Sequence, residues 1–330
     1  MEDIARELSV SKSTVSKALN GAKDISKAMR QSVLEKAVEL GYSRLLRQGD
    51  VPRLAVFITN MEYKKPEDFG YDIVVGFRKA AEPAGFWVDL IDLDAELQAT
   101  MHYDEYMVMG NYSGALFLGL NWQDPWMRDF SSCKTPTVLY DNNIRGNPNV
   151  SYLGVDNTEG MQLAVDYLYE LGHRTIGYLG SGSNAYIYQL RFLNFLQAIE
   201  SHGLSVDRDL TGNTLHISDC LTQHLPRLLE RGCTAIVCSH DMLANSVLNH
   251  CQELGLRVPE DISILGFDDL PLCQLTTPPL TTIRQDRSDL GKSAFFAITN
   301  QLNKVPLGTF LLHASLVQRG SCSRPAGADG

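Results

Sequence analysis

Apolar runs of strand length alternate with helical patterns through most of this sequence, and this alternation constrains the fold more than any other feature. From Arg53 onward, most of these runs are separated by amphipathic stretches of helical length. Strands that alternate with helices in this way form parallel sheets with helices on both faces. The predicted strands are residues 54–58, 87–91, 115–118, 137–140, 152–155, 175–179, 215–217, 235–238, 262–267 and 281–283.

Two helix-to-strand units in this region resemble each other. Residues 77–89 and 195–207 both read Phe-x-x-Ala-x-Glu-x-x-Gly-apolar-x-Val-Asp, and they lie 118 positions apart. This offset within two halves of similar size favours a duplicated βα architecture with two doubly wound lobes. Ligands of open α/β sheets bind outside the carboxyl ends of the strands. We therefore expect a ligand in a crevice between the two lobes.

Side chains that follow the predicted strands are candidates for binding this ligand. Carboxylates combined with one arginine and an aromatic ring are suited to sugars, because they offer paired polar contacts and an apolar face to the hydroxyl-bearing ring. Each aspartate alone could equally cap a helix, and only their repetition, with an arginine opposite, favours the crevice. The candidates are Phe69, Asp72, Asp141, Asn142, Arg191, Asp241 and Asp268.

The first 42 residues have a different pattern, which predicts three short helices. The second helix has Ser11 as its N-cap, and Val15, Ala18 and Leu19 form its buried stripe. Asp and Glu are absent from residues 8 to 23. The opposite face carries short hydroxyls, an amide and two lysines, namely Lys12, Ser13, Ser16, Lys17 and Asn20. Such a face can enter a DNA major groove; the alternative is a small helical cap that packs on the body.

The charge is distributed unevenly between these two parts. Residues 1–47 hold nine Lys and Arg against six Asp and Glu, whereas the remaining 283 residues hold 20 against 33. A cationic head on an anionic body indicates that only the head meets a polyanion. A difference this small also arises by chance, so the charge supports the DNA interpretation without establishing it.

Composition disfavours several other classes of protein. No apolar run approaches the roughly 20 residues of a membrane helix, and the sequence from Met1 to Arg6 does not have the pattern of a signal peptide. The seven cysteines include no Cys-x-x-Cys pair, which favours a reducing cytoplasm over a disulfide framework or a zinc site. We expect a cytoplasmic protein without membrane contact, metal or cofactor.

An NAD-type α/β oxidoreductase is the main enzymatic alternative. Gly180-Ser181-Gly182 follows a predicted strand, but Ala185 stands where a dinucleotide-binding loop has its third glycine. No hydrolase elbow, zinc-protease or phosphate-loop motif is present, and no catalytic residue is predicted. A stand-alone intracellular sugar-binding sensor is the other alternative, and the cationic head argues against it.

Several motifs resemble the lactose-repressor (LacI/GalR) family. In the head they are Asp3-Ile4-Ala5, the string from Val10 to Gly21, Ile25-Ser26 and Leu40-Gly41-Tyr42. In the body they include residues 155–160, 167–180, 191–195, 259–269 and 277–285, so the resemblance extends to about Arg319. It implies a helix-turn-helix transcription factor, expected to be a repressor, whose body resembles a type I periplasmic sugar-binding protein and forms a homodimer.

The resemblance also implies roles for particular residues. Lys12, Ser13 and Lys17 would face base edges of a double-stranded operator, and Ser11, Thr14, Ser16 and Asn20 would contact phosphates or brace the helix. Arg191, Asp241 and Asp268 would contact the effector, and Phe69 would line the wall of the first lobe. Two features depart from the family pattern: Ser9 replaces the usual glycine of the turn, which is tolerable if its φ stays negative, and the linker is short.

These observations predict the following organisation. Residues 1–42 form the helix-turn-helix head and residues 43–52 a short linker. The effector-binding and dimerisation body spans 53–320, with lobe 1 at about 53–155 and 285–309 and lobe 2 at about 156–284 and 310–320. Residues 321–330 are expected to be a disordered tail. Ligand binding between the lobes would control operator affinity.

Overall fold

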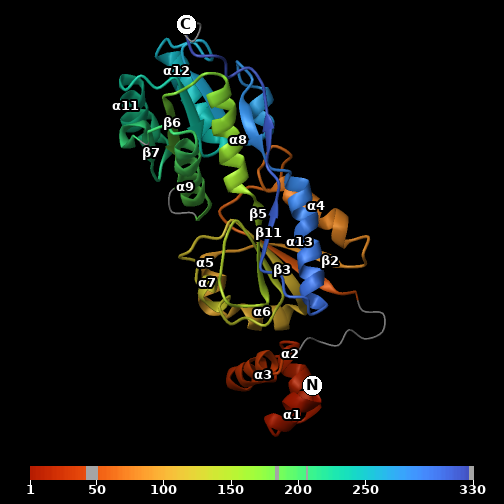
Figure 1. Ribbon diagram of the computed structural model, residues 1–330. Coiled ribbons are helices and arrows are strands. Elements are labelled where there is room, and N and C mark those ends of the chain that lie inside the picture. Colours follow the sequence, from red (N-terminus) through yellow and green to blue (C-terminus); the bar gives the residue numbers. More distant parts are fainter. Residues whose placement is uncertain (42–50, 183–185, 206, 327–330) are drawn as a thin grey trace. The chain divides into compact units, whose positions relative to one another are not determined.

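The computed structural model describes residues 1–41, 51–182, 186–205 and 207–326 (Figure 1). The chain divides into two compact units. The first contains Met1–Lys64, Gly70–Leu153 and Arg287–Phe310, and the second contains Lys65–Phe69, Gly154–Asp286 and Leu311–Gly330. Most of the predicted linker lies outside the described residues, and the functional domain boundaries stay a prediction.

The head consists of three helices, α1 (Glu2–Glu7), α2 (Lys12–Leu19) and α3 (Lys27–Glu39). Two serines start α2 and α3 by accepting backbone hydrogen bonds: Ser11 Oγ accepts from the N–H of Thr14 (3.1 Å) and Ser26 Oγ from that of Met29 (3.2 Å). Apolar side chains from all three helices form a common core, namely Ile4, Ala5, Val15, Ala18, Leu19, Val33, Leu34 and Ala37.

Ser9, in the turn between α1 and α2, adopts a left-handed conformation with φ 53°. The condition under which serine was considered tolerable at this position, a negative φ, is therefore not met. The N–H of Val10 bonds to the carbonyl of Ala5 (2.9 Å), which closes a tight reversal at the end of α1. A glycine would adopt this conformation without steric cost, whereas a residue with a Cβ costs about 1–2 kcal/mol more.

The sheet of the first unit has six strands in the order β11-β5-β4-β3-β1-β2. They are β1 (Arg53–Ile58), β2 (Trp87–Asp92), β3 (Tyr112–Leu118), β4 (Thr137–Tyr140), β5 (Val150–Val155) and β11 (Thr309–Leu312). In Figure 1 α4 (Tyr71–Ala81) and α13 (Arg287–Leu302) lie side by side along the sheet. Three further helices, α5 (Ala95–Thr100), α6 (Tyr103–Gly110) and α7 (Trp126–Asp129), contribute to an aromatic core on the sheet that includes Phe57, Phe117 and Trp126.

The second unit repeats this architecture, with strand order β12-β10-β9-β8-β6-β7. The strands are β6 (Ile176–Gly180), β7 (Thr211–Asn213), β8 (Ala235–Cys238), β9 (Ser263–Asp268), β10 (Thr281–Arg284) and β12 (Ser315–Val317), of which β12 is antiparallel to β10. Helices α8 (Asn157–Glu170) and α9 (Tyr186–Ser201) pack with one core, and α11 (Leu225–Glu230) and α12 (Asp241–Glu253) with the other. Shorter turns are α10 (Ile217–Asp219), Arg208–Leu210, Cys220–His224 and Pro271–Gln274.

Side chains along the central strands β6, β8 and β9 of the second sheet are divided between these two cores. Ile236 and Cys238 belong to one core, and Ala235 and Val237 belong to the other. Strands buried on both faces read as continuous apolar runs. This explains why nine of the ten strands predicted from the sequence coincide with strands of the structure. The predicted strand at 215–217 is wrong, because the strand lies at Thr211–Asn213.

The beginning of the predicted disordered tail is packed against the second unit. Ser321 is fully buried; its hydroxyl donates to the carbonyl of Ile264 (2.6 Å) and accepts from the N–H of Thr281 (2.8 Å). The carbonyl of Ser323 accepts a bond from His173 Nε2 (2.9 Å). The predicted disorder is therefore wrong for 321–326, and 327–330 lie outside the described residues.

None of the helices in the described part of the chain has the length and apolar character needed to cross a bilayer.

Candidate DNA-binding helix and effector site

The exposed face of α2 presents the polar side chains that the sequence singled out. Lys12, Ser13 and Lys17 are exposed, and the last two lie one turn apart on the same helix face. Asn20 braces the end of the helix, because its Nδ2 donates to the carbonyl of Ser16 (2.8 Å). Ser11 and Thr14 share a hydroxyl hydrogen bond (2.9 Å) at the start of the helix.

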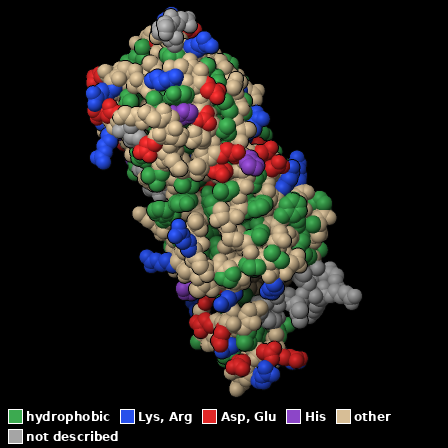
Figure 2. Space-filling view, viewed as in Figure 1, with side chains coloured by type: hydrophobic (Ala, Val, Ile, Leu, Met, Phe, Trp, Pro, Cys, Tyr) green, Lys and Arg blue, Asp and Glu red, His purple; other side chains and the backbone are tan. Residues whose placement is uncertain are grey.

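Two acidic side chains on this surface were not predicted from the sequence. Lys12 Nζ is paired with Glu2, and Lys17 Nζ lies 2.5 Å from Asp24 Oδ2. Their carboxylates come from α1 and from the turn before α3, so their approach to α2 depends on the packing of the three helices. The space-filling view shows basic and acidic side chains intermixed on the visible surface of the head (Figure 2).

Arg191 on α9 is the centre of a buried polar cluster in the second unit. It is 2% exposed, and its guanidinium is hydrogen-bonded and ion-paired. Nε donates to Asn157 Oδ1 (2.9 Å), and Nη1 donates to the carbonyl of Ser239 (2.7 Å) and lies 3.1 Å from Asp268 Oδ1. The guanidinium also lies over the ring of Phe267, 3.8 Å from its centroid. The charge is thus paired and stacked, as a buried arginine requires.

Asp268, at the carboxyl end of β9, has an unusual backbone conformation. Its φ is 117°, a region that favours glycine. Strained residues of this kind concentrate at ligand sites, where the surrounding structure holds a side chain in position. Gln285, directly after β10, fixes the carboxylate by donating from Nε2 to Asp268 Oδ1 (2.6 Å). Sequence analysis did not identify Gln285, although it too follows a strand end.

Asp241 is oriented toward the protein interior, and its predicted role in effector binding is corrected. The side chain is fully buried, with one oxygen accepting from the N–H of Leu270 (2.8 Å) and the other from the hydroxyl of Thr282 (2.6 Å). Burial, together with the negative charge of Asp268, raises the pKa of the Asp241 carboxyl. Asp241 therefore ties α12 to β10 and the loop after β9, which is a structural role.

His240, one residue earlier, stands at the strand end where the sequence pattern had predicted Asp241 to bind the effector. Its Nε2 lies 2.8 Å from Ser181 Oγ, and its Nδ1 accepts from the N–H of Leu243, which caps α12. The ring lies 5.3 Å from that of Tyr188. Ser181 follows β6 and His240 follows β8, so both stand at the same edge of the sheet as Asp268. No signal in the sequence points to His240 beyond this position after a strand.

Acid is expected to destabilise the protein through His240. Burial, followed by the positive charge of Arg191, lowers the pKa of His240 from 6.5 to about 3. The unfolded chain therefore binds a proton below pH 6.5 that the folded chain does not, so stability present above this pH is lost as the pH falls. Between pH 7 and pH 5 this loss amounts to about 2 kcal/mol.

The measurement compares urea unfolding at the two pH values in the wild type and in His240→Asn. Asparagine can still cap α12 but does not titrate, so the variant should lose about 2 kcal/mol less than the wild type. Equal losses in the wild type and His240→Asn would contradict the prediction.

In the first unit, Asp141 and Asn142 stand at the carboxyl end of β4. Asp141 has a left-handed φ of 52°, so the ends of β4 and β9 both carry an aspartate in a glycine-favoured conformation. Asn142 is buried and donates from Nδ2 to the carbonyl of Leu120 (2.5 Å). Within the described residues its Oδ1 is buried without a hydrogen-bond partner. Such an unsatisfied acceptor is costly, which fits a site that a ligand completes.

The other two candidates of this region lie in different units. Asp72 is on α4, where its carboxylate lies 3.1 Å from the buried guanidinium of Arg287 on α13. Phe69 is half-buried and belongs to the second unit with the short segment Lys65–Phe69. The structure therefore groups Asp141 with Asn142, and Arg191 with Asp268.

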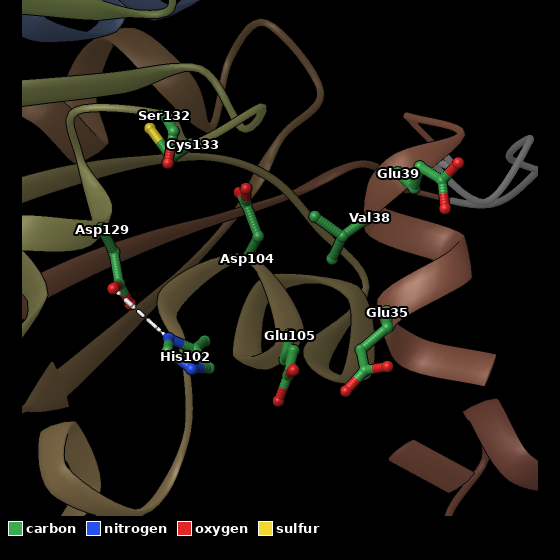
Figure 3. A pocket seen from close by; sticks show the side chains of 9 residues that line it. All are labelled: Glu35, Val38, Glu39, His102, Asp104, Glu105, Asp129, Ser132 and Cys133. Atoms are coloured by element: carbon green, nitrogen blue, oxygen red, sulfur yellow. Dashed lines mark hydrogen bonds and ion pairs between the residues drawn. The ribbon is translucent and has the colours of Figure 1, made fainter. Parts of the chain in front are cut away.

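A pocket of about 310 Å³ in the first unit differs in chemistry from these edges (Figure 3). Its lining is acidic, with Glu35, Glu39, Asp104, Glu105 and Asp129 beside His102. Two of these carboxylates already bind backbone: Asp104 accepts from the N–H of Lys134 (2.8 Å), and Asp129 accepts from that of Tyr103 (2.9 Å). The described residues contain no group of His, Cys, Asp and Glu that could hold a metal ion.

Comparisons with known proteins agree with this arrangement. Residues 1–44 match the family of bacterial regulatory proteins named lacI, and residues 165–322 match the periplasmic binding protein-like domain. The HTH-type transcriptional repressor CytR of Escherichia coli (strain K12) is 28% identical over 97% of this chain and 95% of its own length. The HTH-type transcriptional regulator MalR of Streptomyces coelicolor is 29% identical over 100% of this chain and 98% of its own length.

Solved structures show the same fold. The transcriptional regulator CelR in complex with cellobiose has a TM-score of 0.70 at 24% identity and covers 96% of this chain and 98% of its own. The lac repressor dimer bound to operator and the anti-inducer ONPF has a TM-score of 0.68 at 23% identity, covering 97% and 98%. Residues 1–44 therefore resemble the lacI family of bacterial regulatory proteins, and nearly the whole chain is similar to DNA-binding transcriptional regulators. The class and fold predicted from the sequence are confirmed.

Proposed function

We propose that this protein is a cytoplasmic repressor that binds an operator as a homodimer and changes its affinity when a neutral sugar binds. The observation that carries the proposal is the presence in one chain of a head helix with an exposed polar and basic face and a buried polar cluster at the carboxyl edge of a parallel sheet. A small molecule bound at the cluster can alter DNA binding only if it has different affinities for the two states of the protein.

The DNA contacts would be made by α2. Lys12, Ser13 and Lys17 would reach base edges, and Ser11, Thr14, Ser16 and Asn20 would contact phosphates or stabilise the helix. A homodimer presents two such helices to half-sites about one helical turn apart, so the operator would be a pseudo-palindrome. The relatives named as repressors support this assignment, and the lac repressor has been solved as a dimer bound to its operator.

The charge of the site supports a neutral effector. Arg191 is already paired with Asp268, and the depressed pKa of His240 keeps its ring uncharged. A phosphorylated ligand would bring negative charge to this cluster. The positive charge of Arg191 is already balanced by Asp268, so it would not compensate the phosphate. Paired hydrogen-bonding groups and adjacent rings fit sugar hydroxyls and an apolar ring face. The cellobiose complex of CelR is consistent with this chemistry.

The effector residues that we propose come from both units. In the first they are Asp141 and Asn142, and in the second Arg191 and Asp268, assisted by Gln285, Ser181 and His240. Phe69 and Asp72 remain candidates as predicted from the sequence. Cellobiose, lactose, maltose and galactose make a suitable first panel, with glucose 6-phosphate as the charged comparison.

Binding of the full-length protein to the DNA upstream of its own gene tests the proposal. Fluorescence anisotropy should show affinity that falls with salt, as phosphate contacts require, and that exceeds the affinity for a shuffled DNA sequence. One neutral sugar should change this affinity at least about fivefold. Sugar binding without DNA selectivity would instead identify a stand-alone sensor, and selective DNA binding that only glucose 6-phosphate changes would contradict the neutral effector.

A further inference from the structure

Lys17 and Asp24 place a hydrogen-bond donor and an acceptor side by side on the exposed surface of the head. Lys17 Nζ lies 2.5 Å from Asp24 Oδ2, and their side chains are 53% and 58% exposed. Lys17 belongs to α2, whereas Asp24 lies in the turn before α3. The hydrogen bond to Lys17 lowers the pKa of the Asp24 carboxyl, so at neutral pH this side chain is an acceptor only.

The position of Asp24 is set by the fold of the head. The next residue, Ile25, packs against the head core, and Ser26 is the N-cap of α3. On the other side of the turn, the N–H of Ala22 bonds to the carbonyl of Lys17 (3.0 Å). The carboxylate is therefore attached to a backbone that is fixed at both ends, close to the base-reading face of α2.

We propose that Lys17 and Asp24 together read one G·C base pair of the operator, with Lys17 donating to guanine and Asp24 accepting from the N4 amino group of cytosine. The edge of a G·C pair in the major groove presents the O6 and N7 acceptors of guanine beside the N4 donor of cytosine. A neighbouring ammonium and carboxylate match this order of groups. This inference rests on the proposed DNA contact of α2 and adds Asp24, a residue to which the proposed function gives no role.

The carboxylate would discriminate mainly by exclusion. Opposite an A·T pair it would meet the O4 acceptor or the methyl group of thymine in place of an amino group, and a desolvated carboxylate without a donor is costly. Specific recognition often depends on such a penalty for the wrong partner. Asp24 would therefore lower affinity for most sequences and spare those with cytosine at one position.

The acidic side chain of Asp3 provides a matched control. Asp3 is also exposed and also paired with a basic side chain, because its Oδ1 lies 2.5 Å from Arg6 Nη2. Both of these residues belong to α1, so this ion pair lies within one helix and does not involve α2. Asp3→Ala removes the same charge as Asp24→Ala, so both variants should bind all DNA more tightly through weaker repulsion of phosphates. Only Asp24→Ala should lose base preference.

The experiment selects DNA from a randomised half-site library with the full-length wild type, Asp24→Ala and Asp3→Ala. Competition binding then measures the four base pairs at each selected position. The wild type and Asp3→Ala should prefer G·C at one position about tenfold, and Asp24→Ala should reduce this preference to about threefold or less. A second measurement replaces that cytosine by 2-pyrimidinone, which lacks only the N4 amino group. It should weaken the wild type but not Asp24→Ala.

Each result separates the inference from the function on which it depends. If the wild type selects no sequence at all, the proposed function fails. If the wild type and Asp24→Ala select the same half-site with equal preference, or respond equally to 2-pyrimidinone, the regulator stands and the role of Asp24 as a reader is overturned.

Discussion

Replacing Gly291 by alanine is expected to destabilise the first unit by about 3 kcal/mol or more. Gly291 lies on α13 where this helix crosses α4, and a Cβ there would lie 2.0 Å from the carbonyl oxygen of Ile73 and 2.6 Å from the nitrogen of Phe77. The contact is reciprocal, because a Cβ on Gly76 of α4 would lie 2.0 Å from the carbonyl oxygen of Ser288. These neighbours are backbone atoms, which cannot rotate away as a flexible side chain would.

The sign of this effect makes the test informative. In an isolated helix the same substitution stabilises by about 1 kcal/mol, because glycine has the poorer helix propensity. A net loss of stability therefore means that the steric penalty of the close helix approach exceeds this gain. Urea unfolding of the full chain, followed by circular dichroism, gives the change, and Gly308→Ala is the control because a Cβ there would meet nothing within 4 Å. An increase in stability of Gly291→Ala would contradict the described packing.

This helix contact also shows what a single sequence can predict of the fold. Local periodicity predicted the α/β alternation and most strands, because each buried strand is itself an apolar run. Gly76 and Gly291 come from segments that are distant in the chain, and their importance depends on a contact that no local pattern contains. Ser9 is a smaller example, since the left-handed turn is imposed by the packing of α1 on α2 against the preference of serine.

The candidate site was predictable to a similar extent. The rule that ligands bind after parallel strands identified Arg191 and Asp268, which the structure brings within 3.1 Å of each other. The same rule selected Asp241, whose side chain turns back into the core, because position after a strand does not determine the direction of a side chain. Gln285 and His240 acquire their roles only through neighbours on other strands, so the sequence offered no reason to prefer them.

Replacing Asp268 by asparagine is expected to abolish the response to the effector while operator binding without effector remains. The substitution keeps the shape of the side chain but leaves the guanidinium of Arg191, which is 2% exposed, without its buried counter-charge. Removing one partner of a buried ion pair costs about 3–5 kcal/mol. The paired orientation of Arg191 would be lost with it, so the proposed polar contacts to the ligand would fail together.

Asp269→Asn separates this effect from a general loss of stability. The carboxylate of Asp269 also pairs with two arginines, since it lies 2.6 Å from both Arg284 Nε and Arg319 Nη2. Breaking these pairs weakens the same lobe without touching Arg191. Operator titrations with and without the active sugar should show a response in the wild type and in Asp269→Asn but none in Asp268→Asn. An intact response in Asp268→Asn would place the effector elsewhere. Asp268→Asn could also lose operator binding while its circular dichroism shows that it is folded. The head that contacts DNA contains neither Asp268 nor Arg191, so this result would mean that the Asp268 carboxylate supports the DNA-binding state itself.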